Sequence, residues 1–194
     1  MLLYAAVVIL VAILACYLNM EVISEQSFTV YCSPSKSKIF EFLKTPSNLE
    51  RIHPRIQEVF DIHKHNRTTS FLILEDFGAL LGRKTIPTNL TTSCLSQLTS
   101  CINLDFSSSM ADVTVSLAIS DYDTLRPTSA TNALLPHDVP SATIHTRIQV
   151  KSMRIINYLI SKVVLSLWEK TISSAIDVLE ESTNLNHQES TNLH

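Results

Sequence analysis

Histidines at close spacing are the residues of this chain that could hold a metal ion. His63 and His65 fall on one face of a predicted strand, but no third ligand accompanies them, so a solvated strand end explains them better. His53 directly precedes Pro54 in a turn, where capping or packing is favoured over catalysis. The sequence therefore predicts no metal site.

One carboxylate, Glu75, has a position that could give it unusual chemistry. It shares a strand face with Phe71 and Ile73, so it could be a buried acid with a raised pKa. Its position next to a turn is the favoured explanation. Tyr158 and Trp168 are read as core or rim anchors. No Ser/His/Asp or Cys/His arrangement is distinguishable from chance. We expect no catalytic residue and no cofactor, and the sequence leans toward a binding protein over an enzyme.

The cysteines allow two interpretations. Cys94 and Cys101 could face each other across a hairpin and form a disulfide in an oxidising compartment. The favoured interpretation is that they are free thiols that pack as small apolar groups. None of the cysteine spacings is that of a zinc site.

Charge and glycine content exclude two classes of ligand. The fifteen Lys and Arg residues are scattered and the formal net charge is −3, so a nucleic-acid partner is not expected. The two glycines, Gly78 and Gly82, cannot form a phosphate-binding glycine loop. No protein partner can be identified from the sequence.

The first eighteen residues, MLLYAAVVILVAILACYL, contain no charged side chain. As a helix they would be about 27 Å long, which approaches the thickness of a bilayer core. We predict a single-pass transmembrane anchor over 1–20, with membrane contact through 1–18. A cleaved signal peptide is the main alternative, although the basic residues that usually open one are missing.

Two glycosylation sequons bear on the side of the membrane at which the rest of the chain lies. They begin at Asn66 and Asn89. Both would be meaningful if the domain faced the lumen of the endoplasmic reticulum or secretory pathway. The sequence leans toward that topology without fixing it.

Hydrophobic periodicity divides the remaining chain into a sheet-forming part and a helical part. Alternating residues predict strands over 22–32, 56–63, 70–76, 85–93, 101–106, 113–120 and 144–150. The polar strand 85–93 is expected to be exposed. A long loop is expected over 125–141. From 152 to 181 there is no Gly or Pro and the apolar residues recur at helical spacing, which predicts one helix of about thirty residues. The polar segment 182–194 is expected to be disordered.

The segment between the first two strands carries the most specific motif. It reads Ser33-Pro34-Ser35, then Ile39 to Leu43, then Thr45-Pro46-Ser47-Asn48-Leu49 and Ile52-His53-Pro54. With the order of elements over 21–181, this resembles the START-like superfamily, which includes the polyketide cyclases and the birch-pollen-allergen-like (SRPBCC) proteins. The resemblance implies an α+β helix-grip fold, in which a curved antiparallel sheet of about six or seven strands surrounds one long C-terminal helix.

The resemblance also implies an apolar cavity between sheet and helix that holds a lipid or another apolar small molecule. The residues expected to line it are Phe71, Ile73, Ile102, Leu104, Phe106, Val113, Val115, Leu117, Ile144, Ile148, Ile156, Ile160, Val163 and Leu167. Binding or transport of such a ligand beside a membrane is the leading hypothesis. A cyclase- or dehydratase-like enzyme and an interaction domain with a filled core are the alternatives.

Overall fold

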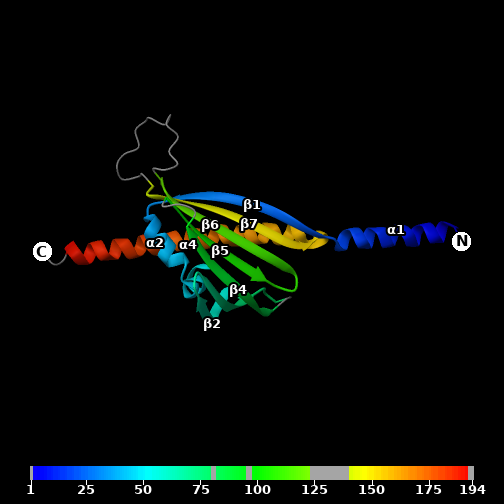
Figure 1. The fold of residues 1–194 in the computed structure, drawn as a ribbon, viewed down its shortest axis with the longest axis horizontal. Coiled ribbons are helices and arrows are strands. Elements are labelled where there is room, and N and C mark those ends of the chain that lie inside the picture. Colours follow the sequence, from blue (N-terminus) through cyan, green and yellow to red (C-terminus); the bar gives the residue numbers. More distant parts are fainter. Residues whose placement is uncertain (1, 80–81, 95–97, 123–139, 192–194) are drawn as a thin grey trace, which may run out of the picture.

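One seven-stranded antiparallel sheet dominates the fold (Figure 1). It is seen in a computed structural model that describes residues 2–79, 82–94, 98–122 and 140–191. The strand order is β1-β7-β6-β5-β4-β3-β2, so the first two strands in the chain form the two edges. The strands are β1 (Glu21–Cys32), β2 (Ile56–His65), β3 (Thr68–Asp76), β4 (Arg83–Cys94), β5 (Thr99–Ser107), β6 (Ala111–Asp121) and β7 (Ala142–Met153). The expected loop over 125–141 lies almost entirely outside the described residues.

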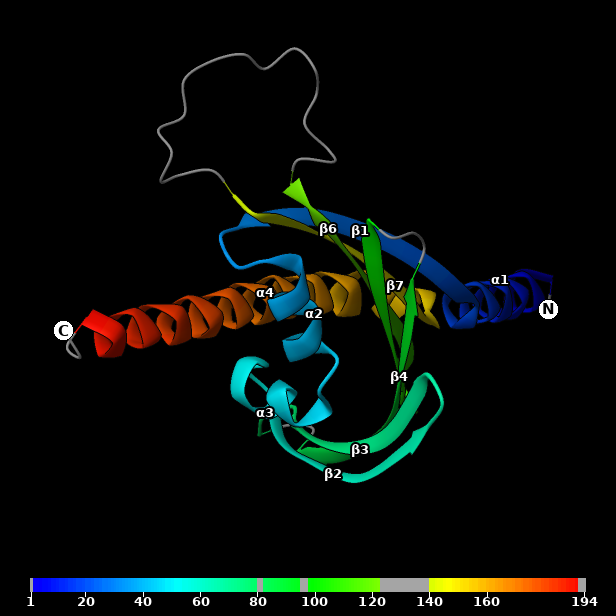
Figure 2. The same ribbon diagram turned by 60° about the vertical axis from the view of Figure 1, so that its left-hand side comes forward.

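A single long helix, α4 (Arg154–Thr191), crosses the concave side of the sheet, which curves around it (Figure 2). It packs mainly against β1 and β7. The predicted α+β helix-grip architecture is confirmed. The predicted end of the helix at 181 and the disorder expected from 182 are wrong as far as Thr191, because no Gly or Pro interrupts the helix there.

The strand alternation predicted from the sequence is confirmed for β5 to β7. Their inward side chains form the core, notably Ile102, Leu104, Val115, Leu117, Ile119, Ile144 and Ile148. The prediction for 85–93 was wrong, because β4 is a central strand with one covered face. Its polar composition hid the inward row of Ile86, Thr88 and Leu90, which is buried.

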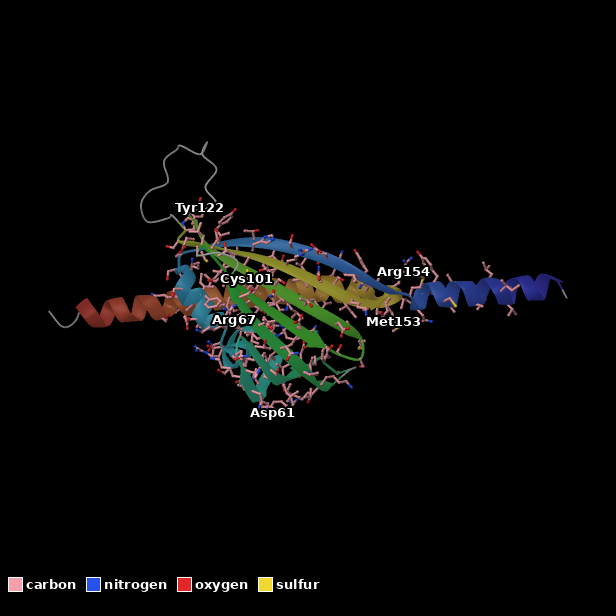
Figure 3. The ribbon with its side chains drawn as sticks, in the orientation of Figure 1. Asp61, Arg67, Cys101, Tyr122, Met153 and Arg154 are labelled. Carbon is pink, nitrogen blue, oxygen red and sulfur yellow. The ribbon has the colours of Figure 1, made fainter. Side chains whose placement is uncertain are left out.

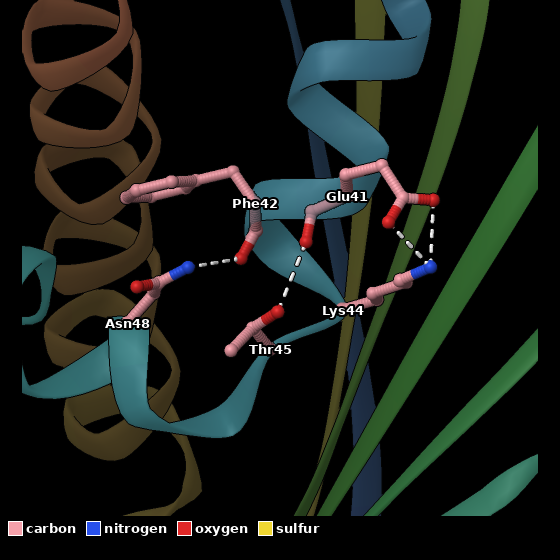
Figure 4. A network of polar contacts seen from close by, with 5 residues as sticks. All are labelled: Glu41, Phe42, Lys44, Thr45 and Asn48. Atoms are coloured by element: carbon pink, nitrogen blue, oxygen red, sulfur yellow. Dashed lines mark hydrogen bonds and ion pairs between the residues drawn. The ribbon is translucent and has the colours of Figure 1, made fainter. Parts of the chain in front are cut away.

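Three short helices connect the two edge strands. They are α2 (Lys36–Leu43), η1 (Pro46–Asn48) and α3 (Leu49–Ile52). Side chains fix the turn between α2 and η1, as Figure 4 shows. Thr45 Oγ1 donates to the Glu41 carbonyl at 3.1 Å, and Asn48 Nδ2 donates to the Phe42 carbonyl at 2.8 Å. The end of α2 is thereby capped by the motif that the sequence singled out.

The N-terminal helix, α1 (Leu2–Asn19), projects away from the sheet at the end where β7 passes into α4 (Figures 1 and 3). The guanidinium carbon of Arg154 lies 4.1 Å from the centre of the Tyr17 ring, and the Arg154 amide donates to the Met20 carbonyl at 2.9 Å. Across the described ranges, no helix combines the length and apolar character needed to cross a membrane. The predicted transmembrane anchor is therefore not confirmed.

A buried polar cluster attaches the first turns of α4 to the edge of the sheet. Asn157 Nδ2 lies 3.2 Å from the carbonyl of Val22 in β1 and 3.1 Å from that of Val150 in β7, and 3.0 Å from Ser152 Oγ. Ser161 Oγ donates to the Asn157 carbonyl at 2.7 Å. Since this amide serves two strands, it fixes both the rotation of α4 and its distance from the sheet.

Replacing Asn157 by Leu is expected to destabilise the protein. The substitution removes the donor that satisfies several buried oxygens, which should lower the free energy of unfolding by about 1–3 kcal/mol. Chemical denaturation of the full-length protein, followed by circular dichroism, measures the change. Tyr158→Leu is the matched control, because Tyr158 is exposed and should change stability by less than about 0.5 kcal/mol. Equal stability of the two variants would contradict the anchoring role of Asn157.

Candidate ligand cavity

A cavity of about 720 Å³ lies between the sheet and α4. Its volume is within the roughly 300–1,000 Å³ that is usual for small-molecule sites. The wall formed by the sheet and its turns is largely apolar and includes Ile56, Ile73, Phe77, Ile86, Pro87, Phe106, Ala111 and Val113. The wall formed by the helix consists of Leu159, Ile160, Val163, Val164, Leu167 and Trp168.

Strand register explains why these side chains meet. Ile73 lies directly opposite Ile86, and Phe106 lies directly opposite Val113, so each pair points to the same face of the sheet. On α4 the lining residues recur at three- and four-residue spacing, which places them on one side of the helix. The cavity thus lies between one sheet face and one helix face.

The structure separates the residues expected to line a cavity into two groups. Ile73, Phe106, Val113, Ile160, Val163 and Leu167 do line it. The lining does not include Phe71, Ile102, Leu104, Val115, Leu117, Ile144 or Ile148, which are buried in the core. Because α2 packs against β5 and β6, that part of the sheet is filled. Ile156 is half-buried and also lies outside the lining.

The buried face of α4 differs from the predicted one mainly in the N-terminal half of the helix. The sequence pattern ran through Ile156, Ile160, Val163, Leu167, Thr171, Ala175 and Leu179. Thr171 and Ala175 are buried as that pattern predicts, and the other buried residues are Asn157, Ser161, Trp168 and Ile172. Asn157 and Ser161, in the first turns of α4, are polar but buried, so the apolar pattern did not reveal the inward face there. The apolar row that the pattern detected is the one that borders the cavity from Ile160 onward.

Glu75 is the acidic side chain of the cavity wall, at the end of β3. Register places it between Ile56 of β2 and Lys84 of β4, on the inward face that also carries Ile73. Burial raises the pKa of Glu75 to about 7, although the nearby Arg55 favours the charged form and lowers it. The sequence favoured the turn over the buried acid, but Glu75 combines both features, because it is a partly buried acid one residue from the end of β3.

His53 lies against the same wall and is buried. Its ring centre is 5.8 Å from that of Trp168, and its Nδ1 lies 3.4 Å from the backbone nitrogen of Arg55. Burial lowers the pKa of His53 to about 4, and the positive charge of Arg55 adds to this effect. The imidazole is therefore neutral at physiological pH and packs, as the sequence indicated.

Two cations of the cavity wall, Arg55 and Lys84, were missed in the sequence. Arg55 precedes β2 in a segment without periodicity, and Lys84 faces inward because the β3–β4 register sets it opposite Glu75. Among the described residues, neither forms an ion pair within 4.0 Å. The alternation of Lys84 with Ile86 was the one signal that could have placed it on this face.

The remaining candidate sites lie outside the cavity. His63 Nε2 is 2.9 Å from Asp61 Oδ1 on an exposed strand end, and the described part of the chain holds no group of three metal-ligating side chains. His145 Nδ1 lies 3.0 Å from Thr29 Oγ1, and Arg147 pairs with Glu25 at 2.6 Å on the outer face. These residues are surface contacts.

The structure gives the positions of the two sequon asparagines and, in part, of the cysteine pair. Asn66 is exposed in the β2–β3 turn, where its φ of 53° suits the residue type, and Asn89 is exposed on the outer face of β4. The Cys94 side chain is not among those described, so the predicted pairing with Cys101 is left open. The register sets Cys101 opposite Ser93.

Comparison with known proteins gives similarity in structure alone. No family model and no curated protein matches the sequence. The di-domain aromatase/cyclase StfQ of the steffimycin pathway is similar with a TM-score of 0.59 and 8% identity, over 84% of this chain and 52% of StfQ. The chain thus spans about half the length of StfQ, and 49% of the di-domain protein BexL.

Two single-domain structures are similar over nearly their whole length. Norcoclaurine synthase from Thalictrum flavum has a TM-score of 0.55 and 7% identity, with 86% of this chain and 91% of that one covered. A START superfamily protein from Mycobacterium smegmatis has a TM-score of 0.55 and 12% identity, with 81% and 97% covered. The architecture and these similarities together show that the chain has the START-like, SRPBCC-type helix-grip fold.

Proposed function

We propose that this protein binds an apolar small molecule or lipid in the cavity between its sheet and α4, next to a membrane. The observation that carries the proposal is the cavity itself, about 720 Å³ of space with largely apolar walls. Such a space would expose its lining to water, and a ligand would gain about 25 cal/mol for each Å² of apolar surface covered. The filled-core interaction domain is disfavoured, because it offers no reason for this space.

A cyclase-like enzyme is the second candidate, and one observation favours it. Four ionisable side chains border the cavity: His53, Arg55, Glu75 and Lys84. An acid whose pKa is about 7 can both give and take a proton near neutral pH, which suits general acid–base chemistry on a bound ligand. StfQ and BexL, which carry the aromatase/cyclase name, have the same fold.

Membrane attachment through α1 completes the proposal. Most of its described side chains are apolar and exposed, with Leu10 67% and Leu14 54% accessible, whereas Leu18 is half-buried and the final residue, Asn19, is polar. The helix contains no charged residue. The strand register places the start of β1 beside the end of β7, and the β5–β6 turn beside the same end. Met110 of that turn and Leu159 of α4 border the cavity and are exposed. A ligand would therefore enter near the base of α1, beside the bilayer.

Occupancy of the cavity can be measured through Trp168, the sole tryptophan, which lies in its wall. We expect dibromo-octadecanol to quench Trp168 fluorescence saturably in the full-length protein held in nanodiscs. Val113→Phe should weaken this binding by about tenfold, because the larger ring occupies part of the space.

Thr114→Phe is the matched control on the neighbouring position of the same strand, whose side chain bonds Asp105 at 2.7 Å on the outer face. It should bind as the natural protein does. Identical quenching in both variants would mean that the probe reaches Trp168 from the bilayer, and the cavity proposal would fail.

Membrane attachment is tested by placing charges on α1. Leu10→Lys with Leu14→Lys should release the protein into the soluble fraction after an alkaline wash, because each lysine costs about 2.5–3.5 kcal/mol at the centre of an inserted helix. The Leu10→Ala, Leu14→Ala variant should remain with the membrane. Retention of the lysine variant would show that another part of the chain holds it there.

We further propose that the domain faces the lumen of the secretory pathway. Asn66 and Asn89 are both exposed and open to a glycosyltransferase. Expression in a eukaryotic cell should give a gel shift that an endoglycosidase removes, and Asn66→Gln with Asn89→Gln should abolish it. A chain that remains unmodified would place the domain on the opposite side.

A further inference from the structure

The charged residues of the cavity are gathered at one end of it. Glu75 and Lys84 are a cross-strand pair near the β3–β4 turn, and Arg55 directly precedes Ile56, which the register also sets opposite Glu75. All three belong to the wall that α4 faces with apolar side chains. The cavity is therefore amphipathic, with one polar end and a long apolar remainder.

The polar end of the cavity carries a net positive charge. Two cations and one carboxylate leave a net charge of one when Glu75 is ionised, and of two when it is protonated. Across the described residues neither cation has an ion-pair partner within 4.0 Å. Charged groups of this kind gain most from an acidic partner that forms charge-assisted hydrogen bonds with them.

We propose that the ligand is a single-chain amphiphile with an acidic head group, which pairs with Arg55 and Lys84 while its chain lies along Phe106, Val113 and Trp168. This inference rests on the proposed function, since it names the class of ligand for the same cavity. Ser107, Ser108 and Ser109 border the same space and add to its polarity, although the Ser107 and Ser108 hydroxyls donate within the protein, to Asp112 Oδ1 at 2.6 Å and to the Ala111 carbonyl at 2.8 Å. The apolar wall of α4 covers the chain.

Glu75 makes the affinity depend on pH. The groups that face it are Arg55, Lys84 and the neutral His53, and the lining residues of α4 carry no titratable side chain. Because the pKa of Glu75 is about 7, the carboxyl is mostly protonated at pH 6 and mostly ionised at pH 8. A negative charge beside the head group then repels it, so affinity for an acidic ligand falls as pH rises.

The experiment ranks head groups on one chain length. Dibromo-octadecanol bound to the full-length protein in nanodiscs is the neutral reporter, and hexadecanesulfonate, hexadecanol and hexadecyltrimethylammonium compete with it. At pH 6 we expect the sulfonate to bind about tenfold more tightly than the alcohol, and the ammonium to bind most weakly. The sulfonate stays ionised from pH 6 to pH 8, so any loss of its affinity over that range, expected to be up to about tenfold, reports on the protein.

Three variants assign the effect to residues. Arg55→Gln with Lys84→Gln should remove the advantage of the sulfonate over hexadecanol. Arg51→Gln with Lys64→Gln removes the same charge from exposed positions outside the cavity and should change nothing. Glu75→Gln should abolish the pH dependence.

The outcomes separate the two proposals. If the brominated alcohol binds but the sulfonate competes no better than hexadecanol, the acidic-ligand inference is overturned and the apolar cavity stands. If the alcohol does not quench Trp168 at all, both proposals fall. If the double Gln variant does not fold, the ranking on the natural protein still decides, because an ammonium that binds as well as the sulfonate contradicts the inference.

Discussion

Attachment of α4 to one edge of the sheet is the constraint on which the rest of the structure depends. The Asn157 amide bonds the backbones of β1 and β7, and a buried amide tolerates little displacement because its partners would be left unsatisfied. An apolar contact could slide or rotate at small cost. With its N-terminal turns fixed in this way, the helix cannot settle toward β3 and β4, and the curved sheet leaves a space on that side.

The polarity of the cavity follows from where strands end. Deep charges would lose their hydration, whereas Arg55, Glu75 and Lys84 lie beside turns, where water is close. Burial nevertheless shifts two pKa values at this wall. It raises the pKa of Glu75 and lowers that of His53, so both groups move toward their neutral forms. An amphiphile fits this gradient, since its head stays near water and its chain replaces the water in the apolar part.

The sequence predicted the fold well because period-2 alternation is strong in β5 to β7. Leu104 and Leu117 could be assigned to the core from their strands alone. Alternation failed where polar residues occupy inward positions, as Thr88 does in β4 and Asn157 does in α4. It also failed in 56–63, where alternation aligned Ile62 with Phe60. The φ of 55° at Asp61 interrupts the regular strand there, and Ile62 is exposed. In each case a tertiary contact or a backbone bend determines on which face of the element a side chain lies. Hydrophobic periodicity detects neither of them.

The charged residues of the cavity were harder to predict from the sequence than the fold, because their positions depend on which strands pair. Glu75 could be suspected because it is two residues from Ile73 on one strand, so a local rule applies. Lys84 acquires its role through pairing with Glu75, and Arg55 through the turn before β2, so both depend on register across a sheet. A one-residue shift of that register would turn Lys84 outward and leave Glu75 without its neighbour. The net positive charge at the polar end of the cavity therefore depends on the register of the β3–β4 hairpin. Gly78, whose φ is 82°, lies between these two strands and helps to set that register.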